Sequence, residues 1–430
     1  MAEEATIDQT SNQERQPTPA EFALPGLLQL TGCADYSLNN PDTLTKYKTA
    51  AQISQKGLDA VIGWCQEGEK IVSICQKGDD LLEKEIAKVY KGKKIAKGIS
   101  HPTTVSPSSY ITPYTPLTTD SEEAAVTLQG GEAIKIQLGA QIDGFGTIVC
   151  DTIIVASDKD KDEKLAGQEA DLLWACHYAN ELLLRLMLPP GLLATGTDEE
   201  KKKAAMEKAP SQSRITKMLE TVAKSYDCNI VESTTSWLFD RNEIEGKKKI
   251  VLAPENENSK GEGIPEVGEV WGVEMGISTG TGKNRILEKR PTLHRRTTIT
   301  YQLKRPSSRK TLSEIVKKFG TFPFSLRQLG DEREAKVGVV ECVRSNVLRQ
   351  YEVIADKDLA PVARVFCTVA PDKEKYKSGK KITDPEILKL LDQPISKPTS
   401  GKSKNKKKKK KPAKKADEND DDEEDSSSDA

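Results

Sequence analysis

Apolar positions along the chain recur with two different periods, which predicts helices that alternate with groups of strands. A cap residue followed by proline, at Asn40 and Pro41, is typical of a helix start. The apolar residues that follow at roughly helical spacing are Leu44, Tyr47, Ala51 and Leu58. A second helix is predicted over residues 81–90, and GEKIVSICQKGDD at 68–80 is interpreted as the connection between the two.

The next elements are two strands and a long helix. Residues 133–138 and 147–155 are β-branched or alternating, as in strands, and QIDGFG at 141–146 predicts a hairpin between them. A strongly apolar stretch from Leu165 to Leu188 predicts a helix that is buried on more than one side and that ends at Pro189. Its apolar members include Leu172, Ala175, Ala179, Leu182 and Leu183.

A further helix has the clearest periodicity in the chain. Its apolar residues fall at i, i+3, i+4, i+7, i+8 and i+11, and they are Ile215, Met218, Leu219, Val222, Ala223 and Tyr226. Between the two helices, residues 196–212 are charged and rich in small side chains, which predicts an exposed insert.

The last third is predicted to hold a strand at 269–279, a helix at 311–320 and a final strand at 362–370. Thr311 and Glu314 have the spacing of a capping box. The residues expected on the core face of this helix are Leu312, Ile315, Val316 and Phe319. Helix pairs thus precede strand groups twice. We predict an α/β fold over residues 41–383, internally duplicated, in which helix pairs cover one side of curved antiparallel sheets.

The two ends of the chain have a different composition. Residues 1–40 are polar and irregular, which predicts a disordered arm. Residues 384–401 are expected to form a linker with a short helix, whose Ile387, Leu390 and Leu391 could enter a groove of a protein partner. Residues 402–430 are first lysine-rich and then acidic, which predicts a disordered tail, so the net charge of -1 conceals a strong separation of sign.

Cysteine spacing and hydropathy limit the class of protein. The 8 cysteines show no spacing typical of a zinc site or a disulfide framework, which favours reduced thiols. The N-terminus lacks the apolar segment of a signal peptide, and no run approaches the ~18 apolar residues of a membrane span. We expect a soluble intracellular protein that has no membrane partner and needs no cofactor.

Four segments carry a family resemblance: KIQLGAQIDGFG with its following strand (135–155), EVWGVEMGISTGTGK (269–283), FPFSLR (322–327) and GVVEC (338–342). They resemble the proliferation-associated, or ErbB-three receptor-binding, proteins. This is a branch of the methionine aminopeptidase superfamily that includes a fungal curved-DNA-binding protein. The resemblance implies the pita-bread fold, in which a pseudo-twofold duplication forms a central cleft.

The resemblance also implies where the active aminopeptidases hold two metal ions. Their five ligands are two aspartates, a histidine and two glutamates. The matching positions here are Gln137, Ile148, Thr234, Glu274 and Phe366, and a further substrate-side histidine falls on Pro113. Asp151 lies three residues beyond Ile148, so in a strand it should face the opposite side. One carboxylate cannot hold two divalent ions, so we expect a non-catalytic protein that binds no metal.

Other catalytic schemes receive no support from the sequence. The three histidines, His101, His177 and His294, are expected to be packed or surface residues. No GxSxG, HExxH, GxxxxGK[ST] or EF-hand pattern is present.

Basic residues gather in two places that could bind phosphates. The first set lies in the predicted fold and comprises Arg295, Arg296, Lys304, Arg305, Arg309, Lys310, Lys317 and Lys318. Tyr301 lies among them and could stack on a base. The second set is the run Lys406, Lys407, Lys408, Lys409, Lys410 and Lys411. Either set could also be no more than a solvated, solubilising surface.

The resemblance implies a partner for these basic residues. Members of the branch, and a fungal export factor of similar fold, associate with the large ribosomal subunit. We therefore expect binding to large subunits, their rRNA or pre-ribosomal particles, and a location in nucleus, nucleolus and cytoplasm. DNA binding or a transcription-related role is the main alternative, and residual metalloaminopeptidase activity and a protein-partner adaptor follow it.

Overall fold

The computed structural model describes residues 36–38, 40–156, 166–188, 190, 197–256, 261–266, 268–366 and 380–393. Residues 1–35 and the whole tail from 402 lie outside these ranges, so the disorder expected there stays a prediction.

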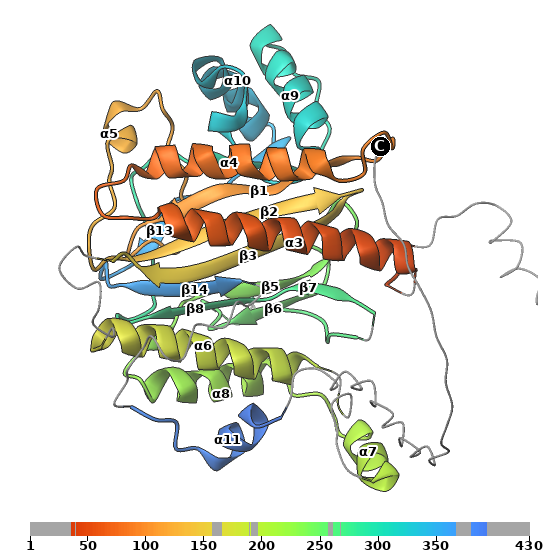
Figure 1. The fold of residues 1–430 in the computed structure, drawn as a ribbon, viewed down its shortest axis with the longest axis vertical. Helices are drawn as coiled ribbons and strands as arrows, with labels where there is room; N and C mark the ends of the chain where they lie inside the picture. The colour runs from red at the N-terminus through yellow and green to blue at the C-terminus, as the bar shows by residue number, and fades with distance from the viewer. Residues whose placement is uncertain are drawn as a thin grey trace, which may run out of the picture. The chain divides into compact units, whose positions relative to one another are not determined.

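A six-stranded antiparallel sheet forms the centre of the fold, in the order β1-β2-β3-β14-β8-β4. Its strands are β1 (Lys97–Ser106), β2 (Ala133–Ile142), β3 (Phe145–Ile154), β14 (Val362–Phe366), β8 (Glu274–Ser278) and β4 (Asn229–Ile230). The helices α3 (Pro41–Trp64) and α4 (Ile71–Lys88) cover the β1–β3 half, and α6 (Gln168–Met187) and α8 (Gln212–Lys224) cover the other half on the same side (Figure 1). The predicted duplicated α/β fold with helix pairs over antiparallel strands is confirmed.

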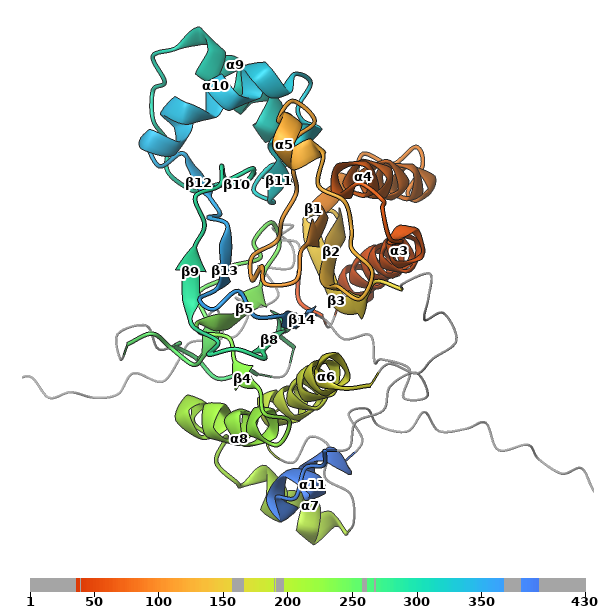
Figure 2. The same ribbon diagram turned by 90° about the vertical axis from the view of Figure 1, so that its left-hand side faces the viewer.

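Three small antiparallel sheets and a third helix pair complete the fold. The sheets are β11-β10-β12, β13-β9 and β6-β5-β7. Their strands are β5 (Thr234–Phe239), β6 (Lys249–Leu252), β7 (Val270–Gly272), β9 (Asn284–Ile286), β10 (Leu293–Arg296), β11 (Phe324–Ser325), β12 (Leu348–Gln350) and β13 (Ile354–Asp356). The helices α9 (Pro306–Lys318) and α10 (Glu332–Arg344) pack on each other near β10 and β12 (Figure 2). The short helices are α5 (Ser121–Ala124), α7 (Asp198–Ala205), α11 (Pro385–Leu391) and the 3-10 turn η2 (Leu326–Gln328).

The predicted hairpin and the helix with the clearest stripe are both present. β2 and β3 are joined by Asp143 and Gly144, with φ values of 57° and 82°, and Ile142 pairs with Phe145. Positive φ at both positions is the requirement of a two-residue turn that matches strand twist. The apolar stripe of α8 is buried as predicted, because it packs against α6 and the sheet.

The connection predicted at 68–80 is wrong, because α4 already begins at Ile71. Gly78 and Asp79 are turn-like residues in the sequence, yet both lie inside the helix for reasons of packing. A Cβ on Gly78 would stand 2.5 Å from Cγ2 of Thr103, so β1 approaches the helix at this point. Asp79 is buried and accepts a hydrogen bond from the Thr103 backbone.

The predicted start of the later helix is also wrong, whereas its core face is confirmed for Leu312, Ile315 and Phe319 and fails only at Val316. α9 begins at Pro306, five residues before Thr311, and Thr311 packs against Gly338 of α10 instead of forming a capping box. The chain just before α9 is held by a residue distant in sequence, since the Glu341 carboxylate accepts hydrogen bonds from the backbone N–H groups of Lys304 and Arg305. Val316, expected in the core, is 41% exposed.

Two smaller predictions need correction. In α3 the buried face holds Ala50, Leu58 and Val61, whereas Leu44 and Ala51 of the predicted stripe are exposed. The strand predicted at 269–279 is two strands, β7 and β8, which belong to different sheets. A Cβ on Gly272 would overlap the rings of Phe239 and Phe366, so only glycine fits at the end of β7.

The C-terminal segment docks on its own fold. Ile387 of α11 is 1% exposed and belongs to the core under α6, so the surface helix predicted to offer Ile387 to a partner's groove is not available in that form. Arg185 of α6 donates a hydrogen bond to the carbonyl of Gln393, and Lys380 forms ion pairs with Asp171 and Asp227.

Other sequence expectations can be compared only with the described residues. The six cysteines among them are buried free thiols. The predicted insert at 196–212 contains α7, which is a short exposed helix rather than a structureless loop. None of the helices described is both long and apolar enough to cross a membrane.

A buried ion pair joins α4 to η2. Arg327 Nη2 lies 2.8 Å from Asp79 Oδ2, and the two side chains are only 4% and 8% exposed. Removing one partner of a buried pair leaves the other charge desolvated without compensation, which is much more costly than losing a surface pair.

We expect Arg327→Met to lower the free energy of unfolding by about 3–5 kcal/mol, because it leaves Asp79 buried and unpaired. Lys310→Met, which breaks the exposed Lys310–Glu334 pair, should cause no measurable change. Urea denaturation followed by far-UV circular dichroism measures both variants. Equal effects of the two substitutions would contradict the importance of this buried pair.

Candidate functional site

One row of residues crosses four strands of the central sheet. Gln137 pairs with Cys150, Cys150 with Phe366, and Phe366 with Glu274. Because side chains alternate along a strand, these residues point to the side opposite the helices, whereas neighbours such as Ile136 pack under α3 and α4. The register therefore gathers side chains from both halves of the chain on the uncovered face.

This face contains a pocket of about 300 Å³. All five positions matched to metal ligands line it, and so does Pro113. Gln137, Ile148, Thr234, Glu274 and Phe366 thus lie together, although up to 229 residues of sequence, from 137 to 366, separate them.

Two of the five positions are occupied by apolar side chains. Ile148 and Phe366 are 3% and 5% exposed. They form an apolar cluster with Cys150, Phe239, Ile244 and Phe322. The rings of Phe239 and Phe366 lie 6.1 Å apart. Side chains of the fold itself therefore fill part of the space between the strands.

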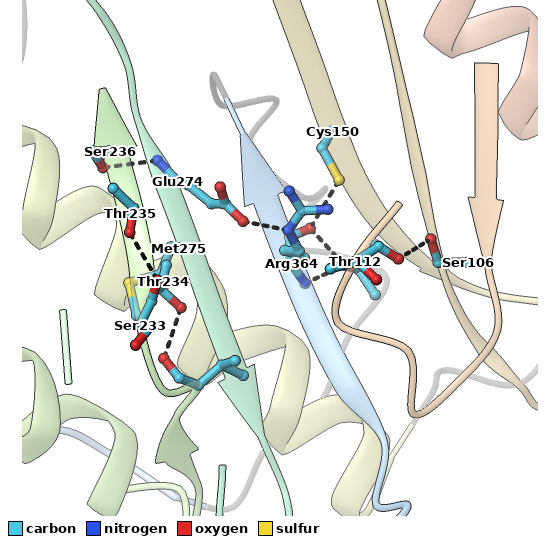
Figure 3. A network of polar contacts seen from close by, with 12 residues as sticks. Ser106, Thr112, Cys150, Ser233, Thr234, Thr235, Ser236, Glu274, Met275 and Arg364 are labelled. Carbon is cyan, nitrogen blue, oxygen red and sulfur yellow. Dashed lines mark hydrogen bonds and ion pairs between the residues drawn. The ribbon is translucent and has the colours of Figure 1, made fainter. Parts of the chain in front are cut away.

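The one surviving carboxylate is held in an ion pair. Glu274 Oε1 accepts a hydrogen bond from Arg364 Nε at 2.5 Å, and the Arg364 side chain is 7% exposed (Figure 3). Arg364 lies two residues before Phe366 in β14, so both point into the pocket. The charge of Glu274 is thus compensated by a residue of this chain.

The backbone of Arg364 is fixed as firmly as its side chain. Thr152 Oγ1 donates to the Arg364 carbonyl and accepts from the Arg364 N–H, both at 2.7 Å. Thr234 is likewise occupied, since its hydroxyl donates to the carbonyl of Val231 at 2.8 Å (Figure 3). Sequence comparison with the metal-binding pattern missed Arg364, although the alternation in VARVF placed it on the same face as Phe366.

The residues of this pocket do not fit a dinuclear metal site. Gln137 is a neutral amide and Ile148 and Phe366 have no donor atoms, while Glu274 is committed to Arg364. Two divalent ions need several carboxylate or imidazole donors. Among the described residues, no group of three or more His, Cys, Asp and Glu side chains could hold a metal ion.

Asp151 lies on the other side of the sheet, as its spacing predicted. It pairs with Ile136, which packs under the helices, so it does not face the pocket. Burial raises the pKa of Asp151 to about 7, although the Thr152 N–H donates to its carboxylate. The aspartate nearest in sequence to the second metal position is therefore a carboxyl group under the helix layer.

The basic residues predicted to bind nucleic acid are not equivalent. Arg295 is 9% exposed and forms ion pairs with Glu243 and Glu245, so it stabilises the fold and does not reach solvent. Arg296 is half-buried on β10. The exposed members are Lys304, Arg305, Arg309, Lys310, Lys317 and Lys318. The run from Lys406 to Lys411 lies outside the described residues.

Three of the exposed cations have partners. Lys310 pairs with Glu334 and Lys318 with Glu314, and Arg309 donates to the carbonyls of Leu303 and Lys304. Sequence analysis missed a second basic segment, the exposed Lys91, Lys93 and Lys94 after α4. Gly98, four residues after Lys94, lies next to the end of α9, since a Cβ on Gly98 would stand 3.8 Å from the Lys318 carbonyl. Only the fold could reveal this proximity.

The raised pKa of Asp151 generates a pH prediction. The unfolded carboxyl has a pKa of about 3.9, so between pH 4 and 7 the native state binds more protons and stability falls as pH rises. We expect wild type to lose more stability than Asp151→Asn between pH 5 and pH 8, measured as the denaturation midpoint at each pH. Parallel pH profiles of the two proteins would refute the elevated pKa.

Comparison with known proteins gives consistent matches. Residues 45–286 match the model of metallopeptidase family M24. The curved DNA-binding protein of Schizosaccharomyces pombe is 37% identical over 388 residues, covering 86% of this chain and 95% of that protein. ErbB-3 binding protein 1 of Arabidopsis thaliana is 33% identical over 386 residues, covering 86% and 91%.

A solved structure agrees with these matches. The structure of a thermophilic Arx1 superposes with a TM-score of 0.81 at 63% sequence identity, covering 83% of this chain and 99% of that one. The sheet, the helix pairs and the cleft are thus those of an experimentally known fold. The chain belongs to metallopeptidase family M24, in the branch of the proliferation-associated and ErbB-3-binding proteins.

Proposed function

We propose that this protein is a non-catalytic member of its family that binds the RNA of large ribosomal subunits or pre-ribosomal particles. The observation that carries the proposal is the set of exposed cations on α9 and the segment before it. Lys304, Arg305 and Lys317 are exposed, and their side chains form no ion pair within the described residues. Unpaired surface cations gain free energy by displacing counterions from nucleic-acid phosphates.

The surroundings of α9 support RNA as the ligand. Tyr301 is 50% exposed beside these cations and offers a ring for stacking on an unpaired base. Lys91, Lys93 and Lys94 extend the positive surface beyond α9. A basic surface that combines several elements of a rigid fold can match the shape of folded RNA, which a charged tail alone cannot do.

The lysine run in the tail adds a second contribution to the affinity for nucleic acid, and this contribution does not depend on the shape of the ligand. Lys406–Lys411 adds phosphate affinity and resembles a nuclear or nucleolar targeting segment. We therefore propose that the protein is present in nucleus, nucleolus and cytoplasm, and that the tail retains it in the nucleolus.

Two alternatives have specific support. The Schizosaccharomyces pombe relative is named a curved DNA-binding protein, and the same cations could bind DNA phosphates. Other relatives are named probable metalloproteases, so peptidase activity is the second alternative. The ligand substitutions at Gln137, Ile148, Thr234 and Phe366 favour the non-catalytic proposal over the second alternative.

We expect purified protein to hold less than one divalent metal ion per two chains and to show no peptide hydrolysis with added cobalt or manganese. Inductively coupled plasma mass spectrometry and a methionyl-peptide assay measure the two properties, with an active methionine aminopeptidase as positive control. Two metal ions per chain, or hydrolysis abolished by Glu274→Gln, would restore the enzyme hypothesis.

We expect wild type to sediment with large subunits in moderate salt, and a Lys304→Glu/Arg305→Glu/Lys317→Glu variant to remain largely at the top of the gradient. The matched control reverses three exposed lysines of the α8 and α11 layer, Lys217→Glu/Lys224→Glu/Lys389→Glu, and should sediment as wild type. Deleting residues 402–430 tests the contribution of the tail. Affinity that depends on the tail alone would favour sequence-tolerant DNA or RNA binding over docking on the ribosome.

A further inference from the structure

Three polar residues at the floor of the cleft pocket lack partners for some of their hydrogen-bonding atoms. Gln137, His101 and Arg364 are 4%, 3% and 6% exposed, and all three line the pocket. Gln137 Oε1 is buried and has no partner among the described residues. Buried polar groups in native proteins are almost always satisfied, so a floor of this kind calls for an explanation.

The hydrogen-bonding roles of these groups follow from the bonds that they already make. His101 Nδ1 lies 2.8 Å from the Pro102 carbonyl oxygen and must donate to it, which leaves Nε2 as an acceptor on a neutral ring. Burial lowers the pKa of His101 to about 3, in agreement with a neutral imidazole. Arg364 donates through Nε to Glu274, and its two Nη atoms make no bond within the described residues. The floor therefore presents donors and an acceptor side by side.

The charges of the pocket cancel. The lining contains three carboxylates, and each has a cationic partner. Glu232 pairs with Lys283, Glu245 with Arg349, and Glu274 with Arg364. Binding a charged ligand would require breaking one of these pairs or burying an unpaired charge, and both are costly. The electrostatics thus select an uncharged ligand.

The walls of the pocket are largely apolar. Ile148, Phe239, Phe366 and Trp237 line it, and a volume of about 300 Å³ is at the small end of ligand pockets. A ligand that fits must combine an apolar body with a group that both donates and accepts hydrogen bonds without carrying charge. An amide group has these properties, since its N–H and C=O complement a carboxamide side chain on one edge.

We propose that this pocket is a binding site for an uncharged amide with an apolar or aromatic body. The amide carbonyl accepts from Arg364 Nη or Gln137, and the amide N–H donates to His101 Nε2 or to the Gln137 oxygen. The apolar body lies against Phe239 and Phe366. The site is separate from the basic surface of α9, so this inference does not depend on the RNA-binding proposal.

Three isosteric probes test the selection by charge: benzamide, benzoate and benzamidine. We expect benzamide to bind in the millimolar range, seen by saturation-transfer NMR with the full-length protein, and the anion and cation to bind at least about tenfold more weakly. A second pair of probes distinguishes a peptide-derived amide from another small amide. N-acetyl-phenylalaninamide represents a blocked peptide end and phenylalaninamide its charged counterpart, and tighter binding of the blocked form than of benzamide identifies a peptide-derived ligand.

The variant Gln137→Leu should weaken benzamide binding roughly tenfold, which corresponds to the loss of one or two hydrogen bonds. It should keep or raise the melting temperature, because it removes a buried oxygen that has no partner. Gln52→Leu, an exposed change on α3, is the control and should leave binding unchanged. Benzoate or benzamidine binding as tightly as benzamide, or no amide binding at roughly 10 mM, would overturn the proposal.

Discussion

The position of β14 between β3 and β8 is the constraint on which the rest of the structure depends. β3 belongs to the first half of the chain and β8 to the second, so this strand joins two helix-covered half-sheets into one. Its register places Gln137, Cys150, Phe366 and Glu274 in a single row. The two hydrogen bonds between Thr152 and the Arg364 backbone hold the register, and a shift by one residue would move Arg364 and Phe366 under the helices.

The same row explains how the cleft is stable without the ligand set of a metallopeptidase. A buried carboxylate needs a cation, and Arg364 supplies it to Glu274 from the adjacent strand. The apolar cluster around Ile148 and Phe366 contacts strands from both halves and provides packing energy in the space between them. Restoring single ligands would not rebuild a metal site, because Arg364 competes for Glu274 and the cluster fills the adjacent volume.

Local patterns predicted most elements, and distant contacts explain the failures. The Asp143–Gly144 turn and the stripe of α8 depend on neighbours in sequence, so both were predictable. The beginnings of α4 and α9 were not, because Asp79 is buried for its pairing with Arg327 and Glu341 of α10 binds the backbone just before α9. Family comparison identified the five positions that meet in the pocket. It missed Arg364, whose role depends on Glu274, 90 residues earlier.

Contacts between residues distant in sequence also decide which basic residues are exposed. Arg295 was expected to meet phosphates, but Glu243 and Glu245, about 50 residues earlier, hold it inside the fold. Lys304 and Arg305 behave differently because Glu341 accepts hydrogen bonds from their backbone N–H groups and forms no ion pair with their side chains. The carboxylate thereby fixes the start of α9 and leaves both cationic side chains exposed. Because the carboxylate is bound through backbone N–H groups, the exposed cationic side chains beside it keep their reach toward the phosphates of a ligand.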